Sequence, residues 1–388
     1  MAPRRIGLVL GGGGLKGFAH IGVLRVLDRM GIEPTVIAGS SIGALIATAY
    51  AAGVPTETLA DRAIALRRRE LFRINHVGML FERMHSPSIY LEGPLRALVE
   101  SVVPNTAMNG FRRPLLVNTV DAEHGTQVVW GLPGLTHVSA VDAVYASCAL
   151  PGFFPPGMVN GRTCIDGGTM DNLPVAITAH LGVDTIIAVD VGSSDLTHAA
   201  SVATDGFASL FMRAASIMMH RLQQRPLLDW SGPPMLLIRP RIAHIPWFGF
   251  GHAADLISAG ERAAEEALGS LGDCLAARGG IFPKRRVTLS VDETRCIGCG
   301  TCVALAPDVM TLDSRRIAVP RVPELVWSPA DGDFVRQCPT RAILAVDADA
   351  AAGATAPDDL APELTATLGG YEDGVRTRTI ERPKIRRR

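Results

Sequence analysis

The chain has 388 residues, 47% of them hydrophobic, so it can bury a sizeable core and is long enough for two domains or one large domain with additions. Its 38 basic and 38 acidic residues give a net charge of zero, which argues against a nucleic-acid partner. The apolar run at residues 6–10 is too short for the apolar core of a signal peptide. We therefore expect a cytoplasmic protein and leave peripheral contact with a membrane open.

The first predicted elements are a buried strand at residues 6–10, a glycine-rich loop and a helix ending at Met30. The loop fits the G-x-G-x-x-G pattern of dinucleotide-binding proteins through Gly12, Gly14 and Gly17. That pattern also needs an acidic residue about 20 positions later to hold a ribose, whereas the second predicted strand ends in Ala38 and Gly39. A P-loop is excluded because neither Ser nor Thr follows Lys16.

The same loop can instead direct backbone N–H groups at an anion, supported by the N-terminus of the helix that follows. Beside a nucleophilic serine, that anion would be the oxyanion of acyl transfer. Loss of one such donor typically costs ~10²–10³ in rate, which would make the requirement for glycine strict. The alternative is that the glycines only allow the helix and the strand to pack closely.

Residues 39–43 read Gly-Ser-Ser-Ile-Gly, a G-x-S-x-G sequence between a β-branched run and a run of small helix-forming residues. In a strand-to-helix turn of this kind, Gly39 and Gly43 allow a tight bend and the serine hydroxyl projects above the sheet. Ser41 is therefore the candidate nucleophile. The uncharged stretch at residues 34–56 is long enough to suggest a transmembrane helix, but its central Gly-Ser-Ser and Pro55 favour strand, turn and helix.

A charged helix is predicted at residues 56–70, and the less regular residues 71–90 would cover the site. Strands at residues 115–120 and 126–130 precede a helix that starts near Ser139.

A hairpin with an Asn-Gly turn is predicted before Asp166, and Asp166, Gly167 and Gly168 follow at the end of its second strand. A carboxylate followed by two glycines can approach another backbone closely and accept a proton from a hydroxyl. Taken alone, Asp-Gly is more typical of an ordinary turn, so its partners in the chain decide the interpretation.

Residues 12–17, 39–43 and 166–168, in this order, resemble the patatin-like phospholipase family over roughly residues 5–280. Residues 18–24 and 146–156 add further family-like sequence. The resemblance implies a patatin-like three-layer α/β fold with a mostly parallel sheet. It also implies hydrolysis of acyl esters, commonly of phospholipids or lysophospholipids.

Carried over to this chain, the resemblance implies a catalytic dyad of Ser41 and Asp166, with no metal at the hydrolase site. The implied oxyanion hole consists of the amides of Gly12, Gly13 and Gly14. Lys16 fills the basic position of the family, and the remaining motif residues are Gly17, Gly39, Gly43, Gly167 and Gly168. The competing arrangement is a Ser-Asp-His triad, for which the chain offers His180, His198, His220, His244 and His252.

Beyond the aspartate, a helix at residues 174–181 and a strand at residues 185–191 continue the α/β alternation. Helices are predicted at residues 207–222 and 254–271. The apolar residues 245–250 between them would be either core or a lip that contacts lipid.

Four of the seven cysteines fall in one pattern, namely Cys296, Cys299, Cys302 and Cys338. A C-x₂-C-x₂-C run with a later Cys-Pro is the ligand pattern of a cubane iron–sulfur cluster, and the presence of Cys299 favours four irons over three. Zinc sites favour separated C-x₂-C pairs instead. The grouping also argues against a secreted disulfide scaffold. We expect the other three cysteines to be buried apolar residues: Cys148, Cys164 and Cys274.

Residues 285–347 resemble the single-cluster bacterial ferredoxins, with residues 287–291 and 343–346 as the paired terminal strands. The resemblance implies a small α+β domain with one 4Fe–4S cluster. So small a domain should depend on its cluster for folding. Residues 350–388 are predicted to be a disordered tail with a basic end.

The sequence thus predicts a hydrolase domain at residues 1–280, a ferredoxin-like domain at 285–347 and a tail at 350–388. The leading functional hypothesis is a serine hydrolase of lipid esters with a fused iron–sulfur module of redox, sensing or structural role. One alternative is a thioesterase or small-ester hydrolase. Another is a redox-responsive protein whose hydrolase is a regulated output and which would need an electron-transfer partner.

Overall fold

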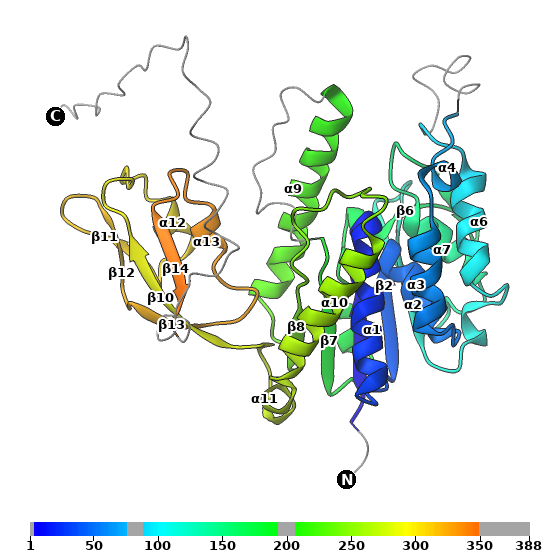
Figure 1. Ribbon diagram of the computed structural model, residues 1–388, viewed down its shortest axis with the longest axis horizontal. Coiled ribbons are helices and arrows are strands. Elements are labelled where there is room, and N and C mark those ends of the chain that lie inside the picture. Colours follow the sequence, from blue (N-terminus) through cyan, green and yellow to red (C-terminus); the bar gives the residue numbers. More distant parts are fainter. Residues whose placement is uncertain (1–3, 76–87, 193–205, 349–388) are drawn as a thin grey trace. The chain divides into compact units, whose positions relative to one another are not determined.

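The computed structural model describes residues 4–75, 88–192 and 206–348 (Figure 1). Its contacts divide the chain into two units, and each unit contains two stretches of sequence. The first unit comprises Met1–Arg285 and Val326–Gln337, and the second comprises Arg286–Leu325 and Cys338–Arg388. The predicted tail, His198 and most of the predicted cover at residues 71–90 lie outside the described residues.

Within the described residues, the first unit is built on a sheet of nine strands in the order β5-β6-β3-β2-β1-β7-β8-β9, with β4 paired to β3. Neighbours are parallel from β3 to β9 and antiparallel around β4, β5 and β6, which confirms the predicted α/β class with a mostly parallel sheet. The strands are β1 (Ile6–Leu10), β2 (Val36–Ser40), β3 (Leu115–Asp121), β4 (Thr126–Trp130), β5 (Gly157–Val159), β6 (Arg162–Asp166), β7 (Thr185–Val189), β8 (Met235–Ile238) and β9 (Ile281–Phe282).

Both faces of this sheet are buried. In β1, Leu8 and Leu10 join one apolar cluster while Val9 joins another, because successive side chains of a strand point to opposite faces. Helices α1 and α10 lie side by side in Figure 1, and their side chains contribute to the first cluster. A sheet with apolar clusters on both faces accounts for the three-layer architecture.

The α-helices that the structure describes in the first unit are α1 (Ala19–Arg29), α2 (Ile42–Ala51), α3 (Thr56–Ala65), α4 (Arg68–Leu71), α6 (Glu92–Val102), α7 (Ala140–Cys148), α8 (Val175–His180), α9 (Gly206–Leu228), α10 (Ala253–Leu268), α11 (Leu271–Ala276) and α13 (Asp333–Arg336). In the part of the chain that the structure describes, no helix is both long enough and apolar enough to span a bilayer.

The second unit is small and rich in strands. Its β10 (Arg285–Val291) pairs antiparallel with β14 (Ile343–Asp347), which confirms the predicted pairing of the terminal strands. The other elements are β11 (Met310–Leu312), β12 (Ala318–Pro320), β13 (Glu324–Trp327) and the short helix α12 (Thr301–Leu305). At β13 the chain passes into Val326–Gln337, the stretch that belongs to the first unit although it lies within the predicted residues 285–347.

Candidate active site and cysteine site

Ser41 occupies the turn between β2 and α2. Its φ of 53° and ψ of −129° lie in a region that non-glycine residues rarely adopt, a strain that typically costs about 1–3 kcal/mol and recurs at functional sites. A Cβ atom at Gly39 would lie 2.5 Å from Gly43 O, and one at Gly43 would lie 2.1 Å from Leu10 O. Side chains are therefore excluded on both sides of the serine, as the G-x-S-x-G pattern predicts.

The Ser41 hydroxyl donates a hydrogen bond of 2.6 Å to Asp166 Oδ2. Asp166 ends β6, and its Oδ1 accepts a hydrogen bond of 2.8 Å from Gly168 N. The carboxyl group is buried, and this burial raises the pKa of Asp166 to about 6, although the hydrogen bonds from Ser41 and Gly168 act in the opposite direction. At neutral pH such a carboxylate is ionised and close to the optimum for a general base.

The predicted alternative, a triad, finds no third member among the described residues. None of the described candidate histidines is hydrogen-bonded to Ser41 or Asp166. His220 faces Asp333, and His252 contacts Asp255 at 3.3 Å.

The glycine-rich loop lies against Ser41, because a Cβ atom at Gly12 would be 3.0 Å from Ser41 Cβ. The Gly12 N–H donates to Asn172 O at 3.1 Å, and the Leu15 N–H donates to Trp247 O at 2.8 Å. Among the described residues, the N–H groups of Gly13 and Gly14 have no hydrogen-bond partner. Of the three glycines predicted as oxyanion donors, Gly12 thus has its amide engaged, while Gly13 and Gly14 remain candidate donors.

Two polar residues of this region, His20 and Lys16, are fully buried. His20 is fully buried and its Nε2 lies 2.7 Å from Gly11 O, while burial lowers the pKa of His20 to about 4. Lys16, in the motif position predicted to be basic, is also fully buried. A Cβ atom at Gly17 would lie 2.3 Å from Ile42 Cγ2, so this glycine allows the loop to pack against the start of α2.

Ser41 and Asp166 both line a cavity of about 110 Å³. Its walls are mostly apolar: Ile42, Leu45, Ile46 and Ala49 come from α2, Leu59 and Ala63 from α3, and Leu98 and Val102 from α6. Trp247 and Phe248 complete the wall, so the apolar residues 245–250 contribute directly to the cavity. A concave apolar site with a few convergent polar groups is typical of a site for an apolar ligand.

The four cysteines of the predicted cluster line one small cavity of the second unit. Ala318 N donates to Cys296 Sγ at 3.4 Å, and Ala342 N donates to Cys338 Sγ at 3.3 Å, as is typical of thiolate ligands whose charge is stabilised by amides. Burial raises the pKa of Cys338, but the hydrogen bonds from Ala342 and Thr340 outweigh it, so this pKa lies below its ordinary value.

In the described parts of the chain, no three His, Cys, Asp or Glu side chains are placed to share one metal ion. A cubane differs from a single ion because each of its irons takes one thiolate, so its ligands surround a volume and need not converge on a point. None of the seven cysteines forms a disulfide bond. Of the other three, Cys164 and Cys274 are buried as predicted, whereas Cys148 is partly exposed and lines the apolar cavity.

Two polar side chains at the site, those of Ser147 and Asn172, were given no role by the sequence analysis. Ser147 accepts a hydrogen bond of 2.9 Å from Ser41 N and donates one of 2.7 Å to Asn118 O. Asn172 donates its side-chain amide to Gly12 O at 3.0 Å, in addition to accepting from Gly12 N. The only sequence signal for Asn172 is a polar residue next to the apolar run that begins at Leu173.

Two parts of the chain match families of known proteins. Residues 8–179 match the family described as patatin-like phospholipase, and residues 289–345 match the 4Fe–4S single cluster domain. Lysophospholipase nte1 from Emericella nidulans is 32% identical over 202 residues, which are 50% of this chain and 12% of that protein. An uncharacterized NTE family protein from Mycobacterium tuberculosis is 33% identical over 233 residues, 58% of this chain and 60% of that protein.

Among solved structures, VipD from Legionella pneumophila is 16% identical with a TM-score of 0.42, covering 69% of this chain and 67% of that one. The chain spans less than two thirds of the length of the curated relatives named above.

Proposed function

We propose that the chain hydrolyses lipid esters with Ser41 as nucleophile and Asp166 as general base, since residues 8–179 match the patatin-like phospholipase family. The observation that carries this proposal is the hydrogen bond of 2.6 Å between Ser41 Oγ and Asp166 Oδ2 in the wall of an apolar cavity.

In the proposed reaction, Ser41 Oγ attacks the carbonyl carbon of the ester while its proton passes to Asp166. The negative charge on the carbonyl oxygen is stabilised by the N–H groups of Gly13 and Gly14. The C–O bond of the ester then breaks, and Asp166 returns the proton to the leaving alcohol. Water attacks the acyl-enzyme with Asp166 again as the base, which releases the fatty acid and restores Ser41.

The apolar cavity supports an acyl chain as the part of the substrate that is bound, and all three motif-bearing stretches of the chain line it, through Gly14, Ser41 and Asp166. The name lysophospholipase of one relative favours phospholipids or lysophospholipids over thioesters and small esters, which are the alternative substrates. A lipid substrate implies peripheral contact with a membrane. No metal is required at this site.

We further propose that Cys296, Cys299, Cys302 and Cys338 hold one 4Fe–4S cluster, which supplies one-electron chemistry when it is redox-active and cross-links the small domain in either case. An electron-transfer partner belongs to the redox alternative only. The hydrolase and cluster-binding parts would act as two domains of a cytoplasmic protein.

The test is a panel of phospholipids, lysophospholipids, thioesters and short esters, assayed with wild type and Ser41→Ala, with the products identified. Ser40→Ala is the matched control, because the neighbouring Ser40 is buried at the end of β2 and has no hydrogen bond to Asp166. We expect free fatty acid from lipid esters with wild type and Ser40→Ala but not with Ser41→Ala. Equal hydrolysis by Ser41→Ala would reject the assignment of the nucleophile.

A further inference from the structure

The segment Val326–Gln337 directly precedes Cys338 in the sequence, yet it packs as part of the first unit. Ala330 is 2% exposed and belongs to the apolar cluster on one face of the large sheet. That cluster also contains Leu173, the neighbour of Asn172, and Leu227 of α9. A stretch that is flanked in sequence by the second, cysteine-containing unit thus contributes to the apolar core of the first unit.

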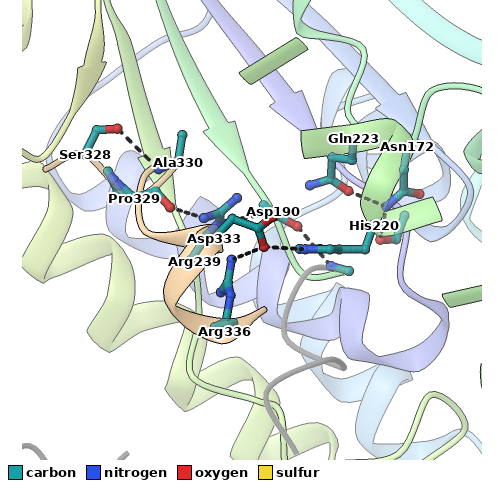
Figure 2. Close-up of polar contacts among 12 residues, drawn as sticks. Asn172, Asp190, His220, Gln223, Arg239, Ser328, Pro329, Ala330, Asp333 and Arg336 are labelled. Atoms are coloured by element: carbon teal, nitrogen blue, oxygen red, sulfur yellow. Dashed lines mark hydrogen bonds and ion pairs between the residues drawn. The ribbon is translucent and has the colours of Figure 1, made fainter. Parts of the chain in front are cut away.

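Asp333, within this segment, is held by α9 (Figure 2). Arg221 Nη1 lies 2.6 Å from Asp333 Oδ2, and His220 Nε2 lies 3.9 Å from Asp333 Oδ1. Gln337, the last residue before Cys338, donates its side-chain amide to the same carboxylate. Contact with His220, and then with Arg221, holds the pKa of Asp333 well below its usual range, so the group is a permanent anion at neutral pH.

A second contact joins the segment to the end of β7. Arg239 donates Nη1 to Pro329 O and Nε to Asp190 Oδ2, the latter at 2.9 Å. Asp190 follows Val189, whose carbonyl oxygen accepts a hydrogen bond of 3.0 Å from Gly11 N. The path therefore leads from Pro329 to the first residue of the glycine-rich loop.

The contact with α9 leads to the same loop. Three residues after His220, Gln223 Oε1 accepts a hydrogen bond of 3.1 Å from Asn172 Nδ2, as Figure 2 shows. Asn172 Nδ2 also donates to Gly12 O at 3.0 Å, and Asn172 O accepts from Gly12 N at 3.1 Å. Both paths thus end at residues 11 and 12, immediately before Gly13 and Gly14, whose N–H groups have no partner among the described residues.

We propose that Val326–Gln337 is a positioning segment for the hydrolase. Through Asp333 and Arg239 it fixes Asn172 and the glycine-rich loop. Full activity therefore requires the iron–sulfur cluster, because that cluster orders Cys338, the residue that follows the segment. This inference rests on the proposed function. Its physical basis is that small iron–sulfur domains fold together with their cluster, so loss of the cluster releases the chain next to Gln337. A displacement of the oxyanion donors by about 1 Å is enough to lower the rate about 10²-fold.

The test uses the full chain, loaded with its cluster, and compares two variants with a matched control. Asp333→Asn keeps the size of the side chain and removes its charge. Gln223→Met removes the oxygen that accepts a hydrogen bond from Asn172, at a position far from the four cysteines in the sequence. Asp229→Asn is the control, because Asp229 pairs with Arg225 of α9 at 2.6 Å but both side chains are exposed.

We expect both variants to lower kcat for a soluble chromogenic ester about tenfold or more, with KM nearly unchanged. Hydrogen exchange of the backbone amides in residues 11–18 should become faster, while absorption at about 400 nm shows the cluster intact. The control should match wild type in all three measurements. Removal of iron from wild type by a chelator should produce the same fall in kcat and the same faster exchange.

The inference is overturned if folded, cluster-loaded Asp333→Asn and Gln223→Met retain the wild-type kcat and exchange, or if iron removal changes neither quantity. A change in KM alone, with exchange of residues 11–18 unaltered, also contradicts it. The exchange measurement does not need turnover. If wild type hydrolyses no ester, the proposed function fails, while the effect of the variants on exchange still decides the role of the segment.

Discussion

Ser41 Oγ and Asp166 Oδ2 lie 2.6 Å apart although 125 positions separate the two residues along the chain. The contact arises because β2, which ends at Ser40, and β6, which ends at Asp166, both pair with β3. The sheet therefore brings the proposed nucleophile and its base together without a third residue among the described ones. Four predictions test this arrangement and the cysteine site.

Replacement of Asp166 by Asn should abolish catalysis while leaving the shape of the site intact. Asn cannot accept the serine proton, so kcat for a chromogenic ester should fall by about 10³-fold or more. The controls are His180→Asn, His244→Asn and His252→Asn, which should keep most of the activity. If a single histidine variant were as inactive as Ser41→Ala, the site would be a triad and the dyad would be wrong.

The pH dependence of hydrolysis should follow Asp166. Its pKa is raised to about 6, and the base acts only when it is deprotonated, so kcat/KM should be level above this pH. Below about pH 6, kcat/KM should fall about tenfold per pH unit, because the ionised fraction of the Asp166 carboxyl group falls about tenfold with each unit. The measurement is the initial rate on a soluble ester at low substrate concentration. Constant kcat/KM down to about pH 4.5 would show that Asp166 is not the titrating base.

Filling the apolar cavity should change the preference for acyl-chain length. Ala49 is fully buried and lies on α2 two turns beyond Ile42, roughly 10 Å further along the helix axis. Ala49→Leu should lower kcat/KM for long-chain esters several-fold and leave the shortest esters almost unaffected. Ala52→Leu, at the exposed end of α2, is the control. Uniform loss at every chain length would indicate that the acyl chain lies elsewhere.

The anaerobically purified chain should be brown, with absorption at about 400 nm and about four irons per chain. Cys338→Ser should lose iron and lower the thermal stability of the second unit, since the proposed cluster would cross-link both of its stretches. Cys274→Ser is the matched control, because Cys274 is a buried free thiol outside the pattern. A colourless chain that carries zinc would exclude the cluster.

Local signals in the sequence were sufficient to predict the elements that carry the motifs. The apolar run of β1, the β-branched run before Ser41 and the Asn-Gly turn before β6 all act over a few residues, and the pairing of β10 with β14 followed from a known pattern. The role of Asn172 could not be predicted, because it depends on a contact with Gly12, 160 positions away.

The hydrogen-bond partner of the Gly12 amide also could not be predicted from the sequence. A glycine-rich loop indicates that N–H groups are accessible, but only tertiary contacts decide which of them already have partners. The packing of Val326–Gln337 with the first unit is a third example, since its composition does not distinguish it from the flanking residues of the cysteine module.

The way the two units share the chain has a consequence for their evolution. The core of the first unit includes Ala330, which the sequence supplies only after the first three cysteines of the C-x₂-C-x₂-C run and before Cys338. Recombination at residue 285 would separate the first unit from a piece of its own interior. Because the two units are interleaved along the chain, we expect them to be inherited, exchanged and lost together.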